Sequence, residues 1–187
     1  MKEILFIKII HCTKDDIKEI FEISEIFKTK LIDYDGNLFG VPYPLPKMDQ
    51  VALPDFEAGA MENWGLTTYR EIAMLANEKS SLEQKLYVCT VVAHELSHMW
   101  FGDLVTMEWW NDLWLNESFA NMMEVYSTDK IRPELCAWDD FYTSAILGAY
   151  HRDCLPGVQP VKVEVKNVED IANLFDGAIV YGKGSRL

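Results

Sequence analysis

The stretch His94-Glu95-Leu96-Ser97-His98 decides how this sequence is interpreted. Apolar residues recur around it at helical spacing, and Ser80-Ser81-Leu82-Glu83 has the pattern of a capping box, with Ser80 as the N-cap and Glu83 reaching back. We therefore predict a helix that opens after Ser80 and runs to Met99. Histidines four residues apart lie on one face of a helix, about one turn apart, so both imidazoles can bind the same metal ion.

Two glutamates complete the pattern of a catalytic metal site. Glu95 follows His94 and is rotated by roughly 100° around the helix, so its carboxylate can meet a water molecule on the metal without binding the metal. Glu117 follows His98 after eighteen residues, in a second predicted helix. Two histidines and one glutamate are a known ligand set for catalytic zinc, which keeps one position open. The sequence predicts one Zn²⁺ per chain, bound by His94, His98 and Glu117.

The histidine motif by itself has a plain alternative, because only three of its five positions are defined and such a pattern also occurs by chance. The third candidate ligand, Glu117, argues against chance. His11 and His151 have no partner at ligand spacing, and we interpret both as ordinary surface or capping residues.

The rest of the chain predicts an α+β fold, with a small mixed sheet early and helices late. The predicted strands cover residues 3–10, 51–53 and 66–69, and the last two flank a glycine-bearing loop over 59–63. A helix over 14–32 should end before the turn signal Asp35-Gly36. Further helices are predicted over 112–126, 134–150 and 167–175.

Composition excludes several classes of protein. Of the 187 residues 49% are hydrophobic, which excludes a disordered chain, and the net charge of −13 disfavours nucleic acid as a partner. A membrane span needs about 20 apolar residues, and residues 1–10 are too short and too interrupted for a signal peptide, so we expect no membrane partner. The four cysteines are widely spaced, which favours reduced thiols and a cytoplasmic location. The composition is compatible with any oligomeric state.

Three further blocks extend the metal motif to a family resemblance. They are Gly59-Ala60-Met61-Glu62-Asn63-Trp64-Gly65, Trp110-Asn111-Asp112-Leu113-Trp114-Leu115-Asn116-Glu117 and Tyr181-Gly182-Lys183-Gly184. Together with the histidine motif they resemble the aminopeptidase N family of zinc metallopeptidases, which are gluzincins. The resemblance implies a thermolysin-like catalytic domain over residues 31–187, after a poorly matched strand and helix over 1–30. It also implies a fragment, because the family's N-terminal β domain and C-terminal helical domain have no counterpart in this sequence.

The resemblance implies a role for each matched residue. Glu95 would act as the general base toward a water molecule on zinc, and Tyr181 would donate a hydrogen bond to the developing oxyanion. Glu62 would bind the free N-terminal amine of a peptide substrate. The other substrate-binding residues would be those around it in the same block: Gly59, Ala60, Met61 and Asn63.

Some assignments stay open when only the residue types are considered. Residue types do not distinguish Tyr181 from three other tyrosines of the helical half, Tyr126, Tyr142 and Tyr150. Asn116 and Asp112 are candidate hydrogen-bond partners of the metal ligands.

Two hypotheses of different class follow. The first is a zinc-dependent aminopeptidase, which hydrolyses the N-terminal residue from peptides with a free N-terminal amine. The alternative is a folded zinc-binding fragment without turnover, because the flanking domains are missing. A thermolysin-like endopeptidase ranks last, since it has no need of Glu62 in its loop.

Overall fold

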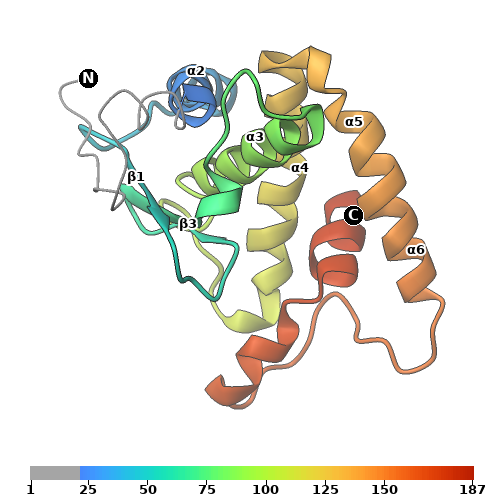
Figure 1. Cartoon of the computed structure of the whole chain (residues 1–187). Coiled ribbons are helices and arrows are strands. Elements are labelled where there is room, and N and C mark those ends of the chain that lie inside the picture. Colours follow the sequence, from blue (N-terminus) through green and yellow to red (C-terminus); the bar gives the residue numbers. More distant parts are fainter. Residues whose placement is uncertain (1–21) are drawn as a thin grey trace.

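Figure 1 shows the computed structural model of the chain, which describes residues 22–187. The strand predicted over 3–10 and the first part of the helix predicted over 14–32 lie outside the described residues. The helices are α2 (Glu22–Phe39), α3 (Leu82–Ser97), α4 (Leu113–Ile131), α5 (Ala137–Asp140) and α6 (Leu147–Asp153), and the strands are β1 (Asp49–Leu53), β2 (Ala60–Met61) and β3 (Leu66–Arg70). The sheet lies on one side of the packed pair α3 and α4, and α5, α6 and the C-terminal segment lie on the other (Figure 1). The predicted α+β class is confirmed.

Short helical segments connect these elements. The 3₁₀ segments are Glu71–Ala73, Trp110–Asp112, Pro133–Leu135, Val168–Leu174 and Gly184–Arg186, and the π-helical segments are Phe141–Ile146 and Gly177–Lys183. The helix predicted over 134–150 is therefore a succession of helical pieces, and the one predicted over 167–175 is a 3₁₀ segment. The π-helical segment Gly177–Lys183 was not predicted, and it carries Tyr181.

The sheet has the strand order β1-β3-β2. β1 runs parallel to β3, with Val51 opposite Thr68, and β2 runs antiparallel to β3, with Ala60 opposite Tyr69. The mixed sheet and the strands predicted at 51–53 and 66–69 are confirmed. β2 lies in the segment that was predicted as a loop. It was not predicted as a strand because two residues are too few to give an alternating pattern.

α2 continues through the predicted turn at Asp35-Gly36 and ends at Phe39, followed by Gly40 at φ +68°. The predicted earlier stop is wrong because Asp35 is fully buried and accepts a hydrogen bond from Ser127 Oγ of α4 at 2.8 Å. This tertiary contact outweighs the turn preference of the Asp-Gly pair. Gly40 supplies the left-handed residue after the helix instead.

α3 begins one residue later than predicted. Its N-cap is Ser81, whose Oγ accepts a hydrogen bond from the backbone N–H of Gln84 at 3.1 Å. Ser80 Oγ instead accepts from the backbone N–H of Asn77. Two adjacent serines are equally able to cap a helix, so the packing around them decides which one does. The helix ends at Ser97, two residues before the predicted Met99.

The main core is built by α3 together with α2, β3 and residues 73–76. Five apolar side chains of α3 are completely buried in it: Val88, Cys89, Val92, Ala93 and Leu96. From Val92 to Ser97 every residue is buried, which includes His94 and Glu95. Buried ionisable groups require a hydrogen-bond partner, a counter-charge or a metal ion, so this end of α3 is where a site is to be sought.

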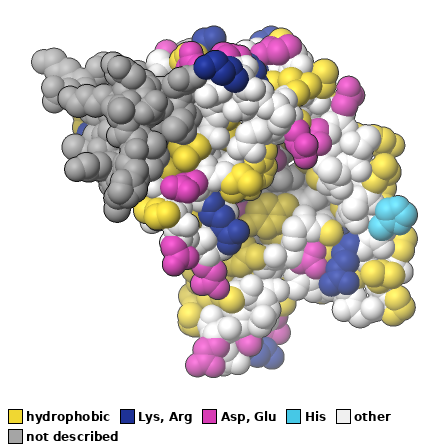
Figure 2. All heavy atoms as spheres, in the orientation of Figure 1, with side chains coloured by type: hydrophobic (Ala, Val, Ile, Leu, Met, Phe, Trp, Pro, Cys, Tyr) yellow, Lys and Arg dark blue, Asp and Glu magenta, His cyan; other side chains and the backbone are white. Residues whose placement is uncertain are grey.

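Hydrophobic side chains are exposed along the edge that α5 and α6 form, as Figure 2 shows. The larger ones are Trp138, Tyr142, Leu147 and Tyr150. Among residues 22–187, no helix combines the length and the apolar character that a membrane span requires. The described cysteines Cys89, Cys136 and Cys154 are free thiols.

The buried carboxyl of Asp35 is expected to make the stability of the fold depend on pH. Burial raises its pKa from 3.8 to about 7, and the hydrogen bond from Ser127 only partly opposes this. The folded chain therefore holds this proton more tightly than the unfolded chain. The resulting stabilisation is complete below about pH 4 and is lost as the pH rises toward 7, with a total of about 4 kcal/mol.

Asp35→Asn removes this titration. We expect the variant to gain stability relative to the wild type as the pH rises from 4 to 8, measured by urea unfolding in the presence of a chelator. Asp33→Asn is the control, because Asp33 is exposed on the same helix. A difference in unfolding free energy that stays constant with pH would contradict the prediction.

Candidate active site

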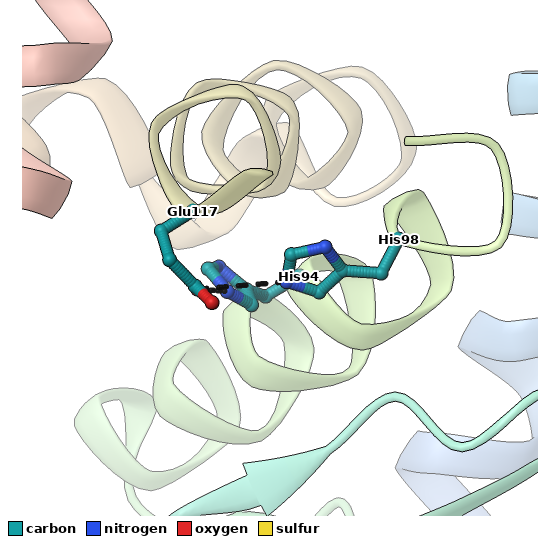
Figure 3. Close-up of side chains that lie close together, drawn as sticks. All are labelled: His94, His98 and Glu117. Carbon is teal, nitrogen blue, oxygen red and sulfur yellow. Dashed lines mark hydrogen bonds and ion pairs between the residues drawn. The ribbon is translucent and has the colours of Figure 1, made fainter. Parts of the chain in front are cut away.

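His94, His98 and Glu117 point toward one another from two helices (Figure 3). The histidines lie at the C-terminal end of α3, and Glu117 lies near the start of α4. One donor atom of each residue lies within 4.8 Å of the others. All three residues are buried, with exposed fractions of 8%, 1% and 6%. The structure thus brings together the three predicted ligands.

The outer hydrogen bonds of the two imidazoles leave their inner nitrogens available to a cation. His94 Nδ1 is 2.8 Å from Glu124 Oε2, and His98 Nδ1 is 2.9 Å from the carbonyl oxygen of Phe101. We assign both Nδ1 atoms as donors, because a carbonyl oxygen and a carboxylate accept. The Nε2 atoms then face Glu117 Oε2, at 3.3 and 3.6 Å. Two imidazole lone pairs and a carboxylate directed at one point fit Zn²⁺.

These contacts also shift the pKa values of the cluster. Burial alone would raise the pKa of Glu117, but when the Nε2 atoms also carry protons, the contacts with His94 and His98 hold it well below its usual range. Burial alone would lower the pKa of each histidine, whereas the hydrogen bond with Glu117 raises both. Protons and a metal ion therefore compete for the same histidine lone pairs.

Glu95 lies beside the cluster and lines the same cavity. It is 5% exposed, and its Oε2 has no hydrogen-bond partner among residues 22–187. Burial raises the pKa of this carboxyl to about 8, against the opposing effect of the charges on His94 and His98. In its ionised form, this carboxyl has an oxygen that is free to accept a proton from a water molecule.

A cavity of about 830 Å³ connects the cluster with the loop over 59–63. On the loop side it is lined by Gly59, Ala60, Met61 and Glu62, and its apolar lining includes Met107, Trp110, Leu113, Ile171 and Phe175. Asn63 is not among the lining residues. Its Nδ2 donates to Thr68 Oγ1 at 3.2 Å, so within this structure Asn63 stabilises the turn between β2 and β3 and is not brought to the cavity.

Glu62 is held close to the ligands by Asn116. Glu62 Oε1 lies 4.0 Å from His98 Nε2 and accepts a hydrogen bond from Asn116 Nδ2 at 3.3 Å. The same amide donates to Glu117 Oε1 at 3.2 Å. A Cβ atom on Gly102 would lie 2.6 Å from Asn116 Oδ1, and Gly102 has φ +138°. Glycine is therefore required at this position for Asn116 to approach both carboxylates.

Tyr181 is the tyrosine that the structure brings to the cluster. Its ring stacks on His94, with centroids 5.9 Å apart and an interplanar angle of 29°. Burial, together with the nearby carboxylate of Glu117, raises its pKa far above the usual range, so the phenol is neutral. The other candidate tyrosines are exposed and do not line the cavity: Tyr126, Tyr142 and Tyr150. The choice that the residue types leave open is thus made by the tertiary structure.

The sequence comparison agrees with this geometry. Residues 24–187 match a protein-family model that is described as the peptidase family M1 domain. The chain belongs to peptidase family M1. The predicted resemblance to the aminopeptidase N family is confirmed.

Curated relatives of this M1 chain are longer proteins that contain a similar stretch of sequence. It is 57% identical over 171 residues to Aminopeptidase N of Lactobacillus delbrueckii subsp. lactis, which covers 91% of this chain and 20% of that protein. Aminopeptidase N of Lactococcus lactis subsp. lactis (strain IL1403) is 51% identical over 176 residues, 94% of this chain and 21% of that protein. Tricorn protease-interacting factor F2 of Thermoplasma volcanium is 46% identical over 180 residues, which are 96% of this chain and 23% of that protein. The M1 chain spans about a fifth of the length of these relatives.

The structure also reveals site residues of the M1 chain that the sequence analysis missed. Glu124 contacts His94, and Asn121 Nδ2 donates to the carbonyl oxygen of Tyr181 at 3.2 Å. Both follow Glu117 on α4 at helical spacing, Asn121 four residues later and Glu124 seven residues later, and this spacing was the available signal. Asn116 does bond a ligand, as predicted. Asp112 does not, because it pairs with Lys162 Nζ at 2.8 Å.

Proposed function

We propose that this M1 chain carries the zinc site of an aminopeptidase, which removes the N-terminal residue from peptides with a free amine. The main observation behind the proposal is the short distance of 4.0 Å between Glu62 Oε1 and His98 Nε2. In one amino-acid residue, the nitrogen and the carbonyl carbon are roughly 2.5 Å apart by standard bond lengths. A substrate ammonium on Glu62 would therefore bring the first peptide carbonyl to the metal ligands. An endopeptidase has no use for such a carboxylate.

Each of the principal residues of the cavity has a separate role in the proposed reaction. Zn²⁺, when bound, supplies Lewis-acid activation of a carbonyl and of a water molecule. Glu95 accepts a proton from the attacking water and delivers it to the leaving amine. Tyr181 donates a hydrogen bond to the oxygen that gains negative charge. Glu62 binds the ammonium, and the backbone of β2 pairs with the substrate as an added strand.

One observation favours a second candidate, a zinc-binding M1 fragment without turnover. The chain covers 20% of the length of its relative from Lactobacillus delbrueckii. The rest of that protein lies outside the match, and part of a complete substrate pocket could lie there as well.

The proposal is tested by loading the purified chain with zinc and comparing leucyl-p-nitroanilide with its N-acetylated form. We expect hydrolysis of the free-amine substrate alone. Equal hydrolysis of both substrates would contradict the role of Glu62 and indicate a broader hydrolase. No hydrolysis by a chain that binds one zinc ion would support the second candidate.

Glu62→Gln is expected to lower kcat/KM for leucyl-p-nitroanilide by about 10- to 100-fold. The reason is the loss of a charge-assisted hydrogen bond to the ammonium, worth about 1.5–3 kcal/mol. Glu57→Gln is the matched control, since Glu57 is an exposed glutamate just before the same loop. Equal values of kcat/KM for Glu62→Gln and the wild type would remove Glu62 from the amine site.

A further inference from the structure

We propose that Glu124 is a positioning residue of the metal site, which fixes the imidazole of His94 and strengthens zinc binding. The inference rests on the zinc site of the proposed function but not on peptide hydrolysis. Glu124 touches neither Zn²⁺ nor the substrate in this scheme, and it acts only through His94.

The geometry places Glu124 behind His94 as seen from the metal site. Its Oε2 is 2.8 Å from His94 Nδ1, while His94 Nε2 faces Glu117 on the opposite side of the ring. Glu124 lies seven residues after Glu117, two turns along the same face of α4. One rigid helix therefore provides a ligand and also holds a ligand that belongs to α3.

The two histidines are held in different ways. His98 Nδ1 is bound to the carbonyl oxygen of Phe101, a main-chain group that no side-chain substitution removes. His94 Nδ1 is bound to a side chain. The orientation and the tautomer of His94 therefore depend on the residue at position 124. A substitution of Glu124 can test this dependence.

The charge of Glu124 supports the same conclusion. Its side chain is 19% exposed, it lines the cavity, and the ion pair that it forms within residues 22–187 is with His94. A carboxylate away from solvent needs a compensating partner. Hydrogen bonding of a carboxylate to the outer nitrogen of a metal-binding histidine fixes the ring and raises its basicity, and loss of such a partner typically weakens metal binding by about 10- to 100-fold.

Two substitutions separate the hydrogen bond from the charge. Glu124→Ala removes both, whereas Glu124→Gln keeps an acceptor oxygen at the same reach without the charge. We expect the zinc dissociation constant, measured by chelator competition, to rise by about 10- to 100-fold for alanine and by less for glutamine. The visible bands of the Co²⁺-loaded chain should shift for alanine and stay in place for glutamine. Asp129→Asn, on the same helix, is the control.

The outcomes distinguish this inference from the proposed function. A lower unfolding midpoint of metal-free Glu124→Ala, with unchanged cobalt bands and zinc affinity, would indicate a merely structural role and overturn the inference. Wild-type affinity and spectra in both variants would also overturn it. A wild-type chain that binds no zinc would refute the zinc site and this inference together. Weakened zinc binding in the variants of a chain that hydrolyses no peptide would support the inference and contradict only the peptidase activity.

Discussion

Replacing Glu95 with glutamine is expected to lower kcat for leucyl-p-nitroanilide by about 100- to 10,000-fold, the usual contribution of a general base. Glutamine has nearly the same shape but does not accept a proton at neutral pH. Glu95 is buried beside the ligands, and its Oε2 is without a hydrogen-bond partner in the described part of the chain. The substitution should therefore leave the packing around it intact.

Initial rates and the zinc dissociation constant are measured on the same preparations of the Glu95→Gln variant and the wild type. We expect the rate to fall while zinc binding is kept, because Glu95 is not one of the three grouped ligands. Glu83→Gln, an exposed position on the same helix, is the control. A Glu95→Gln variant that retains a tenth or more of the wild-type rate would exclude Glu95 as the general base.

Replacing His98 with alanine is expected to abolish the stabilisation of the chain by zinc. A ligand present at a thousand times its dissociation constant stabilises a folded protein by about 4 kcal/mol. For a chain of this size that corresponds to a rise of roughly 8–16 °C in the unfolding midpoint. His98 is 1% exposed and contributes one of the three donor atoms, so its removal leaves only His94 and Glu117 to hold the ion.

Thermal unfolding is measured with zinc and with a chelator, so that any effect of the substitution on the metal-free fold is subtracted. We expect a large zinc-dependent rise for the wild type and none for His98→Ala. His151→Ala is the control, since His151 is exposed on α6. A zinc-dependent rise that survives in His98→Ala would place the zinc site elsewhere in the chain.

The ligand set was predictable because most of it depends on local geometry. Any helix places residues four apart on one face, so His94 and His98 share a face once α3 forms. The capping serines and the apolar spacing were enough to predict α3 to within two residues. Glu117 required only that a second helix pack nearby, and the matched motifs supported that choice.

Other features were missed or mispredicted because distant contacts decide them. Asp35 and Gly36 favour a turn, yet α2 continues because Asp35 is bound by Ser127 from α4. The π-helical segment that carries Tyr181 has no periodic signature. It is held instead by α4, where Ser118 Oγ donates to the carbonyl oxygen of Val180.

The amino-acid sequence alone was sufficient to predict the family, the fold class and the three residues that meet as candidate metal ligands. These follow from residue types at short, fixed separations, which the helical backbone converts directly into positions in space. Glu124 contacts His94 and Asn116 joins Glu62 to Glu117 only in the folded structure, which also brings Tyr181, the tyrosine that the family resemblance implied, to the cluster. The partners in these contacts come from different elements, and their meeting depends on how α3, α4, the β2–β3 turn and the C-terminal segment pack together.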